Sequence, residues 1–178
     1  MLVDAQHKPM GGVSRGVDWF AAGVAGFAAG AVMMVLELAW AASMSDVGPW
    51  RVTQLTAALT LDREATLSAP ASQFKLATVA VALVTHYALG IFSGFVLAWI
   101  LTAIHRVGMV GVAELVGGTF GAVIYVVNFH LLTAWAPWFV ELRGWGTFLV
   151  HVIFGLVAAV LYTWLFKVRQ AGAAEAGN

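Results

Sequence analysis

Four long apolar segments dominate this sequence of 178 residues. Crossing about 30 Å of hydrocarbon at about 1.5 Å per residue takes about 20 residues. The segments 18–44, 74–105, 109–135 and 144–166 are long enough to do so. Only 10% of the residues are charged, whereas a soluble domain typically carries about a quarter. The sequence therefore predicts an all-α integral membrane protein, a four-helix bundle with little chain left for a soluble domain.

The composition excludes several classes of function. Nine basic and nine acidic residues balance, so the basic surface that nucleic-acid binding requires is missing. The absence of cysteine excludes disulfides, iron–sulfur clusters and thiolate nucleophiles. The serines lie in no nucleophile elbow, and no HExxH motif occurs. We therefore expect a non-enzymatic protein whose main partner is the lipid bilayer.

The distribution of lysine and arginine predicts the orientation. The order of the spans places these residues on two sides of the membrane. One side has Lys8, Arg15, Arg106, Lys167 and Arg169, and the other has Arg51, Arg63, Lys75 and Arg143. Because cytoplasmic loops carry the excess of positive charge, the five-to-four bias favours both termini in the cytoplasm.

This orientation assigns the segments outside the spans. Residues 1–17 form a cytoplasmic segment, and 170–178 form a flexible tail. The loop 45–73 becomes periplasmic, and Val52, Leu55 and Leu59 recur within it at helical spacing, which predicts a short helix in the membrane interface.

One pattern of residues occurs twice in the sequence. His86, Gly90, Gly94 and Trp99 recur 65 positions later as His151, Gly155, Ala159 and Trp164. The segments 30–37 and 121–128 also align, which makes Glu37 and Asn128 equivalent. Since each copy contains two spans, the sequence predicts two parallel two-helix repeats related by an axis along the membrane normal.

Small residues four positions apart occur in every span. They are Gly26 and Gly30, Gly90 and Gly94, Gly117 and Gly121, and Gly155 and Ala159. Such pairs let the backbones of membrane helices approach closely. We expect these eight residues to lie where helices pack.

Every span also contributes a polar residue to its outer half. These residues, called the polar layer below, are Glu37, His86, Asn128, His130 and His151. Polar groups inside a membrane are costly and often functional. Glu37 should therefore face the bundle and find a partner there, for which a histidine across the helix interface is the obvious choice.

Three uses of the polar layer remain open at this point. Its members could hydrogen-bond across helices and fix their register, or Glu37 and the histidines could form a proton or ion path. Alternatively, His86 and His151 could be axial ligands of haem b, or bind a transition metal with Glu37. The first two uses suit a small transporter or an accessory subunit without a cofactor, and the third a redox carrier or oxidoreductase subunit.

Several segments resemble a group of small bacterial four-helix inner-membrane proteins of unknown function. They are 48–51, 85–90, 124–130, 137–139 and 151–155. Some members carry the label sodium:proline symporter, but such symporters are built from inverted repeats with broken helices, which this chain lacks. The resemblance implies a bacterial inner membrane and no demonstrated activity. The sequence leaves open whether the chain forms a homo-oligomer or joins a larger membrane complex.

Overall fold

The computed structural model describes residues 16–44, 48–104, 107 and 111–177, and all regular structure within these ranges is helical. The long helices are α1 (Trp19–Met44), α4 (Leu76–Ala103), α5 (Val112–Val126) and α6 (Trp145–Ala176). Helix α5 continues as a π-helix, η1 (Val127–Leu131), and a 3₁₀ turn, η2 (Leu132–Ala134). By length and composition, four helices can cross a membrane. The chain is therefore a multi-pass, all-α membrane protein.

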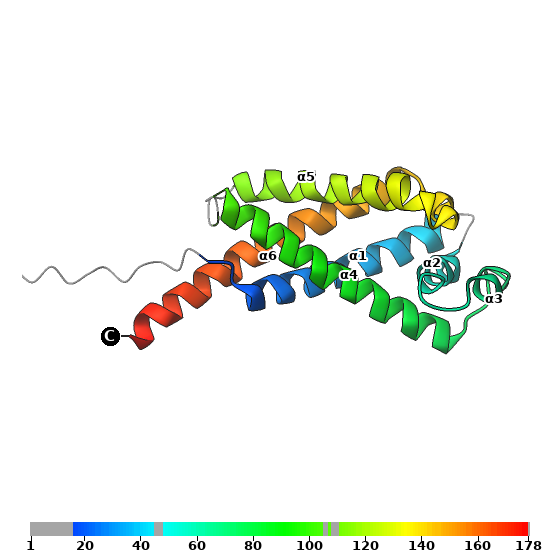
Figure 1. Ribbon diagram of the computed structural model, residues 1–178, viewed down its shortest axis with the longest axis horizontal. Helices are drawn as coiled ribbons and strands as arrows, with labels where there is room; N and C mark the ends of the chain where they lie inside the picture. The colour runs from blue at the N-terminus through cyan, green and yellow to red at the C-terminus, as the bar shows by residue number, and fades with distance from the viewer. Residues whose placement is uncertain (1–15, 45–47, 105–106, 108–110, 178) are drawn as a thin grey trace, which may run out of the picture.

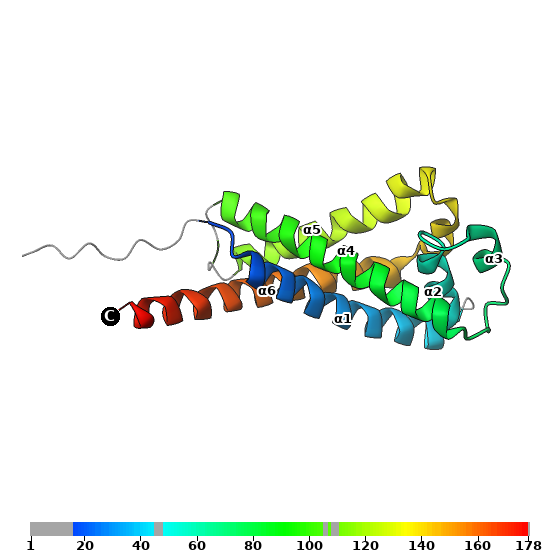
Figure 2. The same ribbon diagram turned by 60° about the horizontal axis from the view of Figure 1, so that its bottom comes forward.

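The main contacts between the four long helices follow the order α5, α6, α1, α4, and all four helices extend along the long axis of the molecule (Figures 1 and 2). Helix α5 packs against α6, α6 against α1, and α1 against α4, whereas α4 and α5 contact each other at few of the described positions. A pseudo-twofold bundle would make the α1–α6 and α4–α5 contacts equivalent. The connections within the two halves also differ. The connection between α1 and α4 contains α2, which packs against both of these helices, whereas the short connection before α6 contains no α-helix.

The α1–α4 and α5–α6 pairs make close contact at small residues. A methyl group at Gly26 would overlap the backbones of Gly90 and Gly94, and one at Gly117 would overlap Gly155 and Ala159. All eight small residues named above are buried, Gly30 and Gly121 included. The backbones thus pack directly on one another, which compensates for the missing hydrophobic drive between helices in lipid.

Three short helices cover one end of the long ones, called the capped end below. They are α2 (Pro49–Ala57), α3 (Arg63–Leu67) and the 3₁₀ helix η3 (Pro137–Leu142). Helix α2 occupies the place where the sequence predicts a helix, and its Leu55 is fully buried. Its position in a membrane interface stays a prediction.

The side chains of Arg51 and Trp138 hold the cap together. Arg51 donates from Nε and Nη2 to the two carboxylate oxygens of Glu141, at 2.9 and 2.8 Å, and from Nη1 to the Leu67 carbonyl at 2.8 Å. The hydrogen bond with Glu141 raises the pKa of the Arg51 guanidinium. Trp138 Nε1 donates to the Leu55 carbonyl at 3.0 Å. These bonds join α2 to both α3 and η3.

At the opposite end α6 differs from the prediction. It remains helical to Ala176, where the sequence analysis places a flexible tail over 170–178. Arg169 forms an ion pair with Asp18 at 2.6 Å and lies over the Phe20 ring, and the following alanines favour a helix. Of the basic residues used for the orientation, Lys8, Arg15 and Arg106 fall outside the described residues.

The glycine contacts predict a position-specific loss of stability. Gly117→Ala should lower the free energy of unfolding by about 1–3 kcal/mol, because the methyl group would press on the backbone of Gly155. The neighbouring Gly118→Ala is the matched control, since its methyl group would make an ordinary contact with Leu156 at 3.4 Å. Unfolding of both variants in detergent, followed by circular dichroism, measures the difference. Equal stabilities would contradict the packing described here.

Candidate functional site

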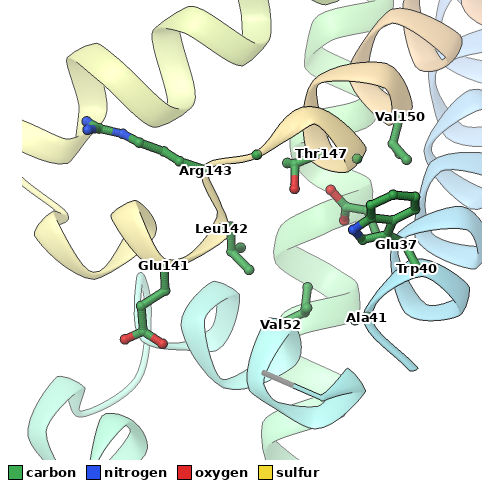
Figure 3. A pocket seen from close by; sticks show the side chains of 11 residues that line it. Glu37, Trp40, Ala41, Val52, Glu141, Leu142, Arg143, Thr147 and Val150 are labelled. Atoms are coloured by element: carbon green, nitrogen blue, oxygen red, sulfur yellow. The ribbon is translucent and has the colours of Figure 1, made fainter. Parts of the chain in front are cut away.

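Glu37 lines two adjoining pockets near the capped end. The first has a volume of about 90 Å³ and is bounded by Trp40, Val52, the segment 141–144 and Thr147. Figure 3 shows the Glu37 carboxylate directed toward Thr147. Within the described part of the chain this carboxylate has neither a hydrogen bond nor an ion pair. The expected histidine partner is therefore not bonded to it.

The second pocket joins Glu37 to His86. Its volume is about 60 Å³, and Met34, Trp50 and Thr53 also line it. His86 Nε2 lies 2.9 Å from the Gly30 carbonyl. Because a carbonyl only accepts, Nε2 carries the hydrogen, which leaves Nδ1 of the neutral ring as an acceptor. This bond to α1 explains why His86 does not pair with Glu37 through Nε2.

A third pocket, of about 70 Å³, brings His86 together with Asn128 and His151. His151 is only 2% exposed, and its Nδ1 donates to the Thr147 carbonyl at 2.8 Å. The rings of Tyr125 and Phe129 lie edge-on to it, with centroids at 5.9 and 5.4 Å. The neutral imidazole therefore keeps Nε2 as an acceptor in an otherwise aromatic environment.

Four members of the polar layer are thus connected in space. Glu37 belongs to the first and second pockets and His86 to the second and third, so the three hollows adjoin one another through these two side chains. His130 does not join them. It is exposed and lines none of the three pockets.

The π-helix η1 contains both Asn128 and His130, which are two positions apart and therefore point to different sides of the helix. Its wider turn, over Val127–Leu131, shifts the phase of the side chains from that of a continuous α-helix. Arg143 stabilises this distortion by donating to the Phe129 carbonyl at 2.5 Å and to Thr133 Oγ1 at 3.1 Å. The sequence does not reveal the π-helix, because no glycine or proline marks the segment.

The two repeated histidines do not fit haem. His86 Nε2 is bonded to Gly30, and the backbone patches at Gly90 and Gly155, on which a porphyrin would lie, are covered by α1 and α5. The pocket that His86 shares with His151 has a volume of only about 70 Å³. The described residues contain no group of three or more His, Asp or Glu side chains placed to hold a metal ion.

Comparisons with known proteins do not indicate what this site does. The chain has no significant match among models of protein families, curated proteins or solved structures. Any assignment of function therefore rests on the polar residues that share these pockets within the four apolar helices.

The closed helix contacts predict the outcome of a haem test. Protein purified in detergent from haem-replete cells should show no Soret band, because the glycine patches beside both histidines are occupied by neighbouring helices. A Soret band that disappears in both His86→Ala and His151→Ala would contradict the packing at these glycines.

Proposed function

We propose that this chain is a small, non-enzymatic membrane transport protein that exchanges a proton at Glu37 with the water on its capped side. The observation that carries the proposal is a carboxylate within a span that has no partner in the described residues and lines two connected pockets. A charge at the centre of a membrane helix costs roughly 2.5–3.5 kcal/mol on insertion scales. Glu37 lowers this cost by binding a proton or by contacting water in the first pocket.

His86 extends the path from Glu37 into the membrane. Histidine can accept a proton on one ring nitrogen and release one from the other near neutral pH. His86 shares a pocket with Glu37 and a second pocket with Asn128 and His151. Both hollows are large enough for water, which needs about 10–15 Å³ and polar neighbours. Proton transfer from Glu37 to His86 through water is consistent with this arrangement.

The proposal includes a duplicated architecture. The α1–α4 contact uses Gly26, Gly90 and Gly94, and the α5–α6 contact uses the aligned positions Gly117, Gly155 and Ala159. These matching contacts support two parallel two-helix repeats. The sparse contact between α4 and α5 would then be a later divergence, in which the first half gained α2.

The cellular location forms part of the same proposal. The charge bias of the sequence supports cytoplasmic termini, which places the capped end in the periplasm. The resemblance to small bacterial inner-membrane proteins supports that membrane. The apolar outer surfaces of α4 and α5, which include Leu89 and Val123, are available for lipid or for a homo-oligomer or larger complex.

The proposal predicts a loss of proton flux in Glu37→Gln. Proteoliposomes containing the wild-type chain should conduct protons faster than protein-free vesicles when valinomycin imposes a potassium diffusion potential. In Glu37→Gln this flux should fall by about tenfold or more, because an amide cannot exchange the proton. A trapped pH-sensitive dye measures it.

Glu114→Gln is the matched control. Glu114 lies in the first turn of α5, and its carboxylate accepts from the Gly111 backbone N–H, a bond that glutamine can also accept. Its flux should equal that of the wild type. A wild-type flux no greater than that of empty vesicles, or an undiminished flux in Glu37→Gln, would overturn the proposal.

A further inference from the structure

Another hollow of the cap lies apart from Glu37. It has a volume of about 640 Å³ and is formed by α2, α3 and the beginning of α4. This is within the range of about 300–1,000 Å³ typical of ligand sites. Polar residues provide much of its lining, namely Thr53, Gln54, Asp62, Thr66, Gln73, Lys75 and Thr78.

One side of the hollow suits a carboxylate. Helix α4, 28 residues long, begins there with Lys75 at its N-cap, and no side chain caps its first N–H groups. Such groups bind anions, assisted by the positive end of the helix dipole. Lys75 and residues Ala77 and Thr78 of the first turn all line the hollow. A negative group would therefore meet a cation and free backbone donors.

Two largely buried threonines provide an independent indication of a ligand. Thr66 is 9% exposed and Thr78 is 7% exposed, yet neither side chain has a hydrogen-bond partner in the described residues. Gln54, which also lines the hollow, is satisfied, because its Nε2 donates to the Pro70 carbonyl at 2.9 Å. The hydroxyl oxygens of Thr66 and Thr78 are accessible from the hollow, because Thr163 Oγ1 is the one buried side-chain oxygen without a partner among the described residues. The two threonines thus offer hydrogen bonds that the protein itself does not use.

An acidic residue lies in the same lining. Asp62 Oδ1 accepts from the Ala65 backbone N–H at 2.8 Å, which leaves Oδ2 for another donor. Asp62 would repel a simple anion, and Lys75 would repel a simple cation. A ligand that carries both charges satisfies both residues.

We propose that this hollow binds a small zwitterionic solute carrying an ammonium and a carboxylate group. The carboxylate binds at Lys75 and the first turn of α4, the ammonium binds at Asp62, and Thr66 and Thr78 hydrogen-bond to the solute. The site does not depend on proton exchange at Glu37. Thr53 lines both this hollow and the Glu37–His86 pocket, so a bound solute lies next to the path proposed above.

Equilibrium dialysis of the detergent-purified full chain with radiolabelled L-serine tests the site. Binding should saturate, and unlabelled serine should compete. The truncated analogues 3-hydroxypropanoate, which lacks the ammonium, and ethanolamine, which lacks the carboxylate, should each need about tenfold or more higher concentration, a difference of about 1.4 kcal/mol. The proposal is overturned if serine shows no saturable binding at concentrations up to about 10 mM, which would detect a dissociation constant of about 1 mM. It is also overturned if either analogue competes as well as serine.

Substitutions locate the binding. Asp62→Asn keeps a good N-cap for α3, and Lys75→Gln changes an exposed side chain, so both variants should fold. Each should weaken serine binding about tenfold or more, as should Thr78→Val if its elution from a sizing column is unchanged. Glu64→Gln, an exposed position on α3 that does not line the hollow, is the control.

Glu37→Gln should bind serine like the wild type, which separates this proposal from proton exchange. Serine binding that is unaffected by both Asp62→Asn and Lys75→Gln places the site elsewhere and overturns the assignment.

Discussion

Direct backbone contact between helices is the constraint on which the rest of the structure depends. Helices in lipid gain no hydrophobic drive toward one another, so close packing at small residues holds them together. Gly26 and Gly90 bring α1 and α4 together, and the two helices diverge from there toward the capped end (Figure 1). The pocket between Glu37 and His86 is lined by the parts of α1 and α4 beyond that crossing. The contact thus positions the polar side chains and leaves space beside them.

The polar groups of the interior are satisfied unevenly. His86 and His151 each use one ring nitrogen on a backbone carbonyl, which fixes the tautomer and leaves the other nitrogen as an acceptor. Arg51 and Glu141 satisfy each other in the cap. Glu37 lines its pockets without a partner in the described residues. Glu37 thus differs from these groups in having no partner. It differs from Asn128, which has no hydrogen bond in the described residues either, in carrying a carboxylate that can exchange a proton.

The spans and the polar layer follow from simple physical rules. Length and composition predict the four apolar helices, and counting 1.5 Å per residue places Glu37, His86, Asn128 and His151 at a similar depth. Depth alone does not give the direction of a side chain: His130, two positions from Asn128, points to another side of the helix and lies outside the pockets. The hollow at Lys75 depends on how α2 packs against α4. The spacing of Val52, Leu55 and Leu59 predicts the short helix, but it does not show which long helix that helix packs against.

Access of water to residue 37 is the central claim, and the absence of cysteine allows a direct measurement. In Glu37→Cys, a membrane-impermeant, positively charged methanethiosulfonate reagent added on the capped side should modify the thiol rapidly. Val35→Cys is the control, because Val35 lies on the same helix with 66% of its surface exposed on the face that we assign to lipid. The account predicts faster modification at 37 than at 35. Equally slow modification at both positions would contradict it.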